Sequence, residues 1–183
     1  TQVGKLIQKS LAGRDVGLTL ELGGKAANIV YEDAAIDQAV EGVVNGIFFN
    51  QGHVCCAGSR LLLQESIHDE FVAKLEKRMQ TLRVGNPLDK NTDIGAINSK
   101  EQLNKIEGLV NEGVSDGGKI FQTECELPGN GFWFKPTLFT DVQPSYSIAR
   151  EEIFGPVLTT LTFRTPQEAV EIANNTEYGL SAG

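Results

Sequence analysis

The sequence predicts an α/β domain in which helices flank a mostly parallel sheet. Short apolar segments, typical of strands, alternate along the chain with longer segments whose apolar residues recur at helical spacing. The chain has 183 residues, of which 40% are hydrophobic, so it can form a sizeable core. This length indicates one domain, or one domain and part of a second. No internal repeat or low-complexity segment interrupts the alternation.

The first predicted elements are a helix and a strand that runs into a glycine pair. Apolar residues at helical spacing predict a helix over Val3–Leu11, which Gly13 is expected to end. The segment Leu18–Leu22 alternates apolar and polar residues and predicts a strand, so Glu21 is expected at a strand end, beside Gly23-Gly24. Because Thr1 lies at the start of a helix and no initiating Met precedes it, we expect a truncated chain.

Strands and helices are expected to alternate beyond this turn. Strands are predicted at 28–31, 61–63, 119–122 and 157–163, and helices at 35–49, 66–82, 99–114 and 165–174. Capping residues indicate three of the helix starts: Ser66 for one, Ser99 with Gln102 for another, and Thr165 with Glu168 for the last. Residues 136–142 predict an extended strand at the sheet edge, because Pro136 cannot donate to a ladder.

The composition excludes several classes of protein. Lys and Arg total 16 against 24 Asp and Glu, a net charge of -8, and no basic run could follow a nucleic-acid backbone. No apolar stretch approaches the roughly 18 to 20 residues of a membrane helix, and no signal-peptide pattern opens the chain. Three cysteines without a CxxC pair favour a reducing, cytoplasmic compartment. Two histidines leave little material for a metal site, so no metal is expected.

The loop over residues 50–59 is the segment most suited to catalysis. It places Cys55 and Cys56 among small residues, between a predicted helix and a predicted strand. Loops held by a rigid scaffold often carry catalytic groups, and a cysteine thiolate is a strong nucleophile. From composition alone, two buried cysteines that pack as small hydrophobic residues are the favoured alternative.

Four segments together resemble the aldehyde dehydrogenase superfamily. The segment 48–60, FFNQGHVCCAGSR, resembles its active-site cysteine signature, and 20–25, LELGGK, resembles its glutamate signature. The segment 151–157, EEIFGPV, resembles its cofactor-contacting segment, and GNPL at 85–88 with DIG at 93–95 resembles its connecting loop. The resemblance extends over essentially the whole chain. It implies a Rossmann-like catalytic domain at 18–183, truncated at its C-terminal end, after a helix at 1–17 that ends the cofactor-binding domain.

The resemblance also implies roles for particular residues. Cys55, three places after Gly52, is the implied nucleophile, and Cys56 is then a packing neighbour. Glu21 is the implied general base, in a partly apolar setting between two leucines; without the resemblance it is an ordinary strand-end carboxylate. The implied cofactor-binding residues are Glu152 on the nicotinamide ribose, Phe154 beside the ring, and more weakly Gln102, Lys105 and Leu22. For Gln102 and Lys105, a solvated helix face explains the pattern about as well.

These roles imply oxidation of an aldehyde to a carboxylic acid with NAD or NADP. Cys55 adds to the aldehyde, a hydride leaves to the nicotinamide, and Glu21 activates the water that hydrolyses the resulting thioester. In the resembled family the phosphate-binding Gly precedes the position of Thr1, and the oligomerisation segment follows that of Gly183. We therefore expect this chain alone to bind cofactor poorly, and the full-length protein to form a homodimer or homotetramer.

Two alternative functions stay open. His53, where the family often has Gln, lies two residues from Cys55, and residues two apart on an extended segment point the same way. A Cys/His pair would suit a thiol esterase or acyl-transferase that needs no nicotinamide. The second alternative is a fragment or pseudoenzyme that serves as an association unit. The sequence does not decide between NAD and NADP, and it does not identify the aldehyde.

Overall fold

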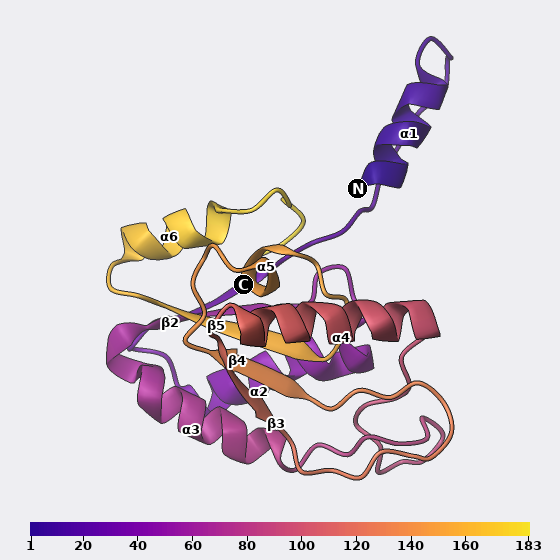
Figure 1. Ribbon diagram of the computed structural model, residues 1–183. Coiled ribbons are helices and arrows are strands. Elements are labelled where there is room, and N and C mark those ends of the chain that lie inside the picture. Colours follow the sequence, from indigo (N-terminus) through magenta and orange to yellow (C-terminus); the bar gives the residue numbers. More distant parts are fainter.

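A computed structural model describes all residues 1–183 and shows one five-stranded sheet with helices on both faces (Figure 1). The strand order is β1-β2-β5-β4-β3. These strands are, in that order, Ala27–Val30, Arg60–Gln64, Val157–Phe163, Thr137–Thr140 and Lys119–Gln122. The first four run parallel, and β3 pairs antiparallel with β4 at one edge. The predicted α/β fold with a mostly parallel sheet is confirmed.

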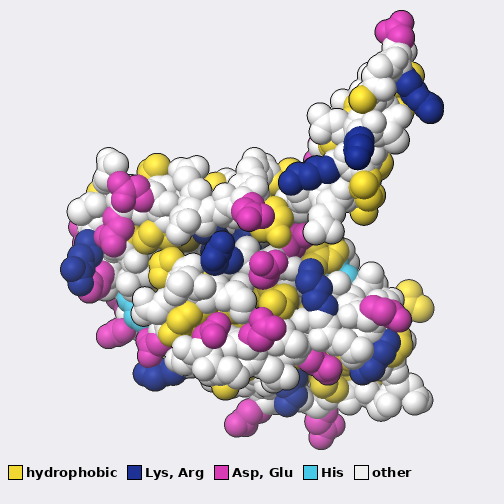
Figure 2. Space-filling model, turned by 45° about the horizontal axis from the view of Figure 1, so that its top comes forward, with side chains coloured by type: hydrophobic (Ala, Val, Ile, Leu, Met, Phe, Trp, Pro, Cys, Tyr) yellow, Lys and Arg dark blue, Asp and Glu magenta, His cyan; other side chains and the backbone are white.

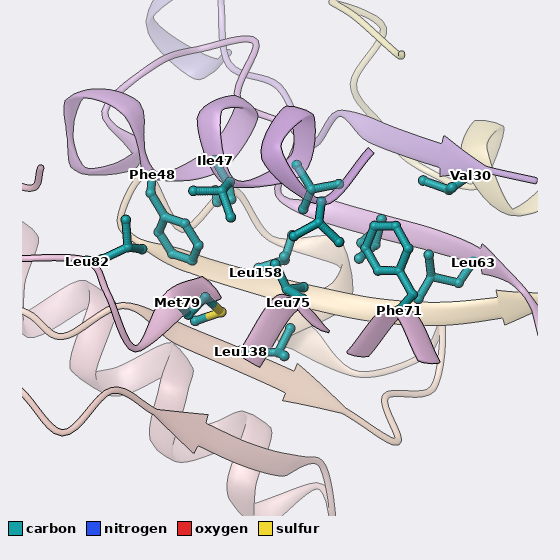
Figure 3. Packing of buried hydrophobic residues seen from close by; sticks show 14 of the residues in the cluster. Val30, Ile47, Phe48, Leu63, Phe71, Leu75, Met79, Leu82, Leu138 and Leu158 are labelled. Carbon is teal, nitrogen blue, oxygen red and sulfur yellow. The ribbon is translucent and has the colours of Figure 1, made fainter. Parts of the chain in front are cut away.

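The core forms on both faces because successive strand residues point to opposite sides. Leu61 and Leu63 of β2 pack with the helices α2 (Ile36–Phe48) and α3 (His68–Met79) in the cluster of Figure 3. Leu62 points the other way and packs with α6 (Pro166–Asn174). The helices α4 (Lys100–Ser115) and α5 (Ser147–Arg150) cover the remainder of that second face. The sheet is thereby buried on both sides, as parallel sheets usually are.

The first helix, α1 (Gln2–Leu11), stands away from the sheet (Figure 1). It confirms the helix predicted from residue 3, and Gly13 follows it with a φ of +80°. Its apolar side chains are largely in solvent, with Val3 and Leu6 67% and 66% exposed (Figure 2). The domain boundary at residue 17 stays a prediction. None of the helices is both long enough and apolar enough to span a membrane.

The strand predicted over residues 18–22 is wrong. These residues are extended but join no ladder, and the chain from Gly17 to Ala26 has no regular secondary structure. Alternation of apolar and polar residues indicates a strand only where a partner strand is available, and the pairing partners of β1 are β2 and Ala182. Glu21 therefore precedes a strand instead of ending one.

The extended element predicted at 136–142 exists as β4, but its expected place at the sheet edge is wrong. It lies between β3 and β5. Pro136 stands just before the first paired residue, so its missing N–H removes no ladder bond, and its carbonyl still accepts from Thr123. The edge strand of this side is β3, whose residues are mostly exposed.

The predicted helix caps are confirmed in part. The side chains of Ser99 and Thr165 accept the backbone N–H groups three residues later, at 3.1 Å and 3.2 Å. The Glu168 carboxylate binds the Arg164 N–H instead of the Thr165 N–H, and Gln102 does not return to Ser99. The predicted cap at Ser66 is wrong, because its hydroxyl donates to Glu32 and a short 3-10 turn, η2 (Glu65–Ile67), leads into α3.

Candidate active site

The fold brings the three motif segments to one edge of the sheet. Residues 21–26 lead into β1, the cysteine loop leads into β2, and residues 151–156 lead into β5. Because β1, β2 and β5 are adjacent and parallel, the segments that precede them meet at the amino ends of the strands. Open α/β sheets more often carry ligands at the carboxyl ends. The candidate site therefore lies in the loops at the amino ends of the strands, and not at the carboxyl ends, where this class of fold more often binds ligands.

Backbone contacts hold the three segments together. The Gly24 N–H donates to the Glu152 carboxylate at 3.1 Å. A Cβ added at Gly24 would lie 2.4 Å from the carbonyl oxygen of Cys55, closer than real Cβ atoms approach. A Cβ at Gly52 would lie 2.1 Å from the carbonyl oxygen of Gly155. Glycine is therefore required at both positions, because the backbones themselves are in contact.

The cysteine loop begins with an unusual turn. The short helix η1 (Phe49–Gly52) follows α2 directly, and Asn50, Gln51 and Gly52 have φ values of 49°, 47° and 74°. Two non-glycine residues in the left-handed region are uncommon and need surrounding contacts to hold them. The turn presents Cys55 and Cys56 at the surface, so the alternative of two buried, hydrophobic cysteines is wrong.

The Cys55 backbone N–H makes no hydrogen bond within the chain, and neither do the N–H groups of Val54 and Cys56 on either side of it. It is therefore available as a donor to a bound oxygen atom. Glu21 is also exposed, and the partly apolar setting expected for it is wrong. No hydrogen bond joins Glu21, His53 or Cys55 to one another.

The predicted cofactor residues form a connected group around residues 152–154. Gln102 donates through Nε2 to the carbonyl oxygens of Ile153 and Phe154, at 2.8 Å and 3.0 Å. Lys105 Nζ donates to the carbonyl oxygen of Glu152 at 2.6 Å. Neither side chain belongs simply to a solvated helix face, since each holds the backbone of the candidate cofactor segment. Their direct contact with a cofactor stays a prediction.

A cavity of about 720 Å³ adjoins this group. The cavity lies between the start of α1 and the segments 151–152 and 177–178. It is lined by Thr1, Gln2, Lys5, Glu151, Glu152, Glu177 and Tyr178. The volume lies within the roughly 300 to 1,000 Å³ of ordinary ligand sites. The half-buried Glu152 can accept hydrogen bonds from ribose hydroxyls there, so this carboxylate suits the ribose of a nicotinamide nucleoside, whereas Phe154 does not line this cavity. Leu22 does not line this cavity; its side chain lies against Gly4 of α1.

Lys25 and Arg60 are two buried cations at the ends of the motifs. Arg60 donates to the carbonyl oxygens of Lys25, Ile172 and Ala173, so it fastens the glutamate segment to the C-terminal end of α6. Lys25 is fully buried and its Nζ has no hydrogen-bond partner. Burial and the nearby Arg60 charge lower the pKa of Lys25 to about 7, against the opposing pull of Glu151 and Glu152. A lysine beside a glycine pair is visible in the sequence, but the burial of Lys25 is visible only in the fold.

His53 does not serve as the partner of Cys55 that the sequence left open. Its Nε2 accepts the Asn98 backbone N–H at 3.3 Å, and its ring stacks on Phe154 at a centroid distance of 5.3 Å. The ring is thus occupied on one edge and one face by groups other than the thiol. No three His, Cys, Asp or Glu side chains gather in a way that could hold a metal ion.

The chain matches the aldehyde dehydrogenase family over residues 1–183. Retinal dehydrogenase 2 of Taeniopygia guttata is 48% identical and that of Homo sapiens 47% identical over 187 residues, covering 100% of this chain and 35% of the relative. The structure of an NAD-dependent aldehyde dehydrogenase from Sinorhizobium meliloti has a TM-score of 0.94 at 42% identity, over 99% of this chain and 36% of that one. Betaine aldehyde dehydrogenase from Staphylococcus aureus, in complex with NAD+, has a TM-score of 0.92 at 39% identity, over 99% and 37%.

The chain therefore belongs to the aldehyde dehydrogenase family. The resemblance seen in the sequence motifs is confirmed, and so is the fold that it implies. The chain spans about a third of the length of these relatives.

Proposed function

We propose that the full-length protein containing this chain oxidises an aldehyde to a carboxylic acid, with NAD as the hydride acceptor. The observation that carries the proposal is the meeting of the cysteine loop, the glutamate segment and residues 151–156 at one sheet edge, in a member of this family. NAD is favoured over NADP because the similar solved structures are NAD-dependent or hold NAD+. Assembly into a homodimer or homotetramer stays a prediction, as does a cytoplasmic location.

The proposed reaction starts at Cys55. Its exposed thiolate attacks the carbonyl carbon, which forms a C–S bond and places negative charge on the oxygen. The unpaired Cys55 N–H is suited to donate to that oxygen, because a donor already in place needs no reorganisation. A nicotinamide held by Glu152 and Phe154 would supply the acceptor for the hydride, with its electron pair, that is lost from the same carbon. A thioester on Cys55 is left.

Glu21 is proposed to complete the cycle. Its exposed carboxylate takes a proton from water, the resulting hydroxide adds to the thioester, and the C–S bond breaks to release the acid and the Cys55 thiolate. Glu152 is proposed to hold the nicotinamide ribose, and the Gly24 N–H fixes one of its oxygens for that task. Phe154, which Gln102 holds by its carbonyl, is proposed to lie beside the nicotinamide ring.

Cysteine substitutions in the full-length enzyme test the nucleophile. Cys55→Ser is expected to abolish reduction of NAD with every member of an aldehyde panel, whereas Cys56→Ser is the matched control and is expected to retain near-normal turnover. Both cysteines are exposed and adjacent, so a general effect on the loop would appear in both variants. If Cys56→Ser is the inactive variant, the assignment of the nucleophile is wrong. If the wild type reduces neither NAD nor NADP with any aldehyde, the proposed function is wrong.

A rapid-mixing experiment tests the role of Glu21. Glu21→Gln is expected to give a stoichiometric burst of reduced cofactor and then a slow steady state, with acylated Cys55 visible by mass spectrometry. The reason is that hydrolysis removes a proton from water whereas the hydride step does not. A slow burst that recovers at higher pH would instead assign Glu21 to thiol deprotonation. An unchanged burst and steady state would leave Glu21 without a catalytic role.

A further inference from the structure

His53 joins the cysteine loop to the candidate cofactor segment. Its ring stacks on that of Phe154 with an interplanar angle of 21° and a centroid distance of 5.3 Å. Its Nε2 accepts the backbone N–H of Asn98 at 3.3 Å, which ties the same ring to the residue that precedes the cap of α4. His53 Nδ1 is buried and lacks a hydrogen-bond partner. The imidazole therefore lies where three segments meet, two residues before Cys55.

The backbones that carry this stack are both in sparsely populated conformations. Asn50 and Gln51, just before His53, have φ values of 49° and 47°, and Phe154 itself has a φ of 56°. Non-glycine residues keep such conformations only where surrounding contacts hold them. Around Phe154 these contacts include the Gln102 amide on its carbonyl and the His53 ring on its side chain. The stack thus connects two turns whose backbones are in the left-handed region.

The contact with Asn98 requires a neutral imidazole. A ring nitrogen accepts an N–H only when it carries no proton of its own, so Nε2 is the acceptor and the ring proton resides on Nδ1. Protonation of Nε2 would place two N–H donors against each other. Burial lowers the pKa of His53, which keeps the ring neutral at neutral pH, although the side chain of Asn98, as distinct from its backbone N–H, and the Gln51 backbone oppose this shift.

The charged groups around the ring do not govern its protonation. The nearest titratable side chains along the packed segments are Cys55 on its own loop, Lys100 after Asn98, and Glu152 before Phe154. The pKa of His53 is set by burial and by its two uncharged neighbours, and none of these three groups contributes to it. A change in the charge of the ring therefore acts on the stack and on the Asn98 contact directly.

We propose that His53 is a positioning residue, whose neutral ring holds the Cys55 loop against Phe154 and whose protonation releases that loop. The proposal rests on the proposed function, because it assigns to His53 the placement of the nucleophile relative to the segment that is to contact the nicotinamide. His53 itself contacts no reacting atom in this scheme. It acts through Phe154 and through the backbone that leads to Cys55.

The test compares pH profiles of kcat/KM for the full-length wild type, His53→Gln and His53→Phe between pH 5 and 8.5. Gln keeps an acceptor for the Asn98 N–H and a planar amide that can lie on the Phe154 ring, but it does not titrate. His53→Gln is therefore expected to match the wild type within about twofold at pH 8. The ratio of wild type to His53→Gln is expected to fall roughly tenfold toward pH 5, the equivalent of one lost hydrogen bond. The fall should be centred below 6.5, the ordinary pKa of histidine. The ratio isolates the effect of residue 53, because all other residues are the same in the two enzymes.

His53→Phe keeps a ring on Phe154 but removes the acceptor. It is expected to lose roughly tenfold in kcat/KM at every pH and to show no His53-dependent fall. His68→Gln is the matched control, since His68 is the second histidine of this chain and pairs with Asp69 on α3. Its ratio to wild type is expected to stay flat. A flat wild-type to His53→Gln ratio, or a His53→Phe variant as active as wild type, would overturn the proposal.

A second readout separates this inference from the proposed function. The rate of Cys55 alkylation by iodoacetamide, measured in a Cys56→Ser background, reports the position of the loop without any turnover. The ratio of the alkylation rate of wild type to that of His53→Gln is expected to change between pH 5 and 8.5, as the ratio of kcat/KM does. If the enzyme oxidises no aldehyde but this ratio changes, the proposed function fails and the positioning role stands. If oxidation is normal and both ratios are flat, the positioning role fails alone.

Discussion

Gly52 is the position where the cysteine loop comes closest to the segment before β5, so Gly52→Ala is the sharpest perturbation of the site. Its φ of +74° lies in the left-handed region, which costs a residue with a Cβ about 1 to 2 kcal/mol. The new Cβ would also stand 2.1 Å from the Gly155 carbonyl oxygen and 2.5 Å from its carbon. These are backbone atoms, which cannot rotate away as a flexible side chain can. Overpacking of this kind costs about 1 to 3 kcal/mol.

The two effects together predict that Gly52→Ala lowers the free energy of unfolding by about 2 to 5 kcal/mol. If the loop shifts to relieve the clash, Cys55 moves with it, and kcat/KM is expected to fall at least about a hundredfold. Urea denaturation followed by circular dichroism measures the first quantity, and reduction of NAD by the full-length enzyme measures the second. A variant that loses little stability must then lose activity, because one of the two segments has moved.

Gly42→Ala is the matched control for this change. Gly42 lies within α2, is exposed, and would place a Cβ in open space. Alanine is the better helix former, so this variant is expected to gain up to about 1 kcal/mol and to keep full activity. The reasoning is refuted if Gly52→Ala stays within about 0.5 kcal/mol of wild type and is also fully active.

Three further changes test other parts of the site and the fold. Lys25→Met is expected to flatten the rise in stability with pH. The pKa of Lys25 is near 7 in the folded state and 10.5 in the unfolded state, so below pH 7 this lysine destabilises the protein by about 5 kcal/mol. The destabilisation fades as the pH rises from 7 to 10.5. Urea denaturation from pH 6 to 10 checks this, and equal slopes for variant and wild type would contradict it. Glu152→Gln is expected to raise the KM for NAD about tenfold, the loss of one charged hydrogen bond, whereas Glu107→Gln, at an exposed carboxylate of α4 outside the cavity, should change it less than twofold. Equal effects in steady-state kinetics would count against Glu152 as the ribose ligand. Thr165→Ala is expected to cost about 1 kcal/mol in the thermal unfolding of the full-length protein, because the Glu168 N–H loses its cap, and an unchanged midpoint would show that the Glu168 carboxylate is sufficient to hold this helix start.

The helices and most strands could be predicted because their signals are local. The spacing of Val40, Val43, Val44 and Ile47 indicates one buried helix face, and these residues are all buried. The caps at Ser99 and Thr165 are likewise short-range contacts between neighbours in the chain. The family resemblance that points to Cys55 is local too, because the residues that carry it, 48–60, are consecutive in the chain.

The errors arose where structure depends on partners distant in the chain. Residues 18–22 have the alternation of a strand but no strand beside them, and Pro136 precedes a strand that is interior because β3 pairs with it. Gln102 forms half of a capping box in sequence, yet its amide binds carbonyls 51 and 52 residues away. Local sequence patterns predict which contacts a segment can form, and they do not identify the distant segment with which it forms them.

The family, the fold class and the candidate residues Cys55 and Glu21 could be inferred from the chain alone, because motif chemistry and periodicity reside within short segments. The meeting of three such segments at the amino ends of β1, β2 and β5 is visible only once the chain is folded. The same holds for the contacts of His53 with Phe154 and Asn98 instead of Cys55, and for the burial of Lys25 without a partner. The physical reason is that burial, stacking and backbone contact are properties of pairs of distant segments, which exist only once the parallel strands have set those segments side by side.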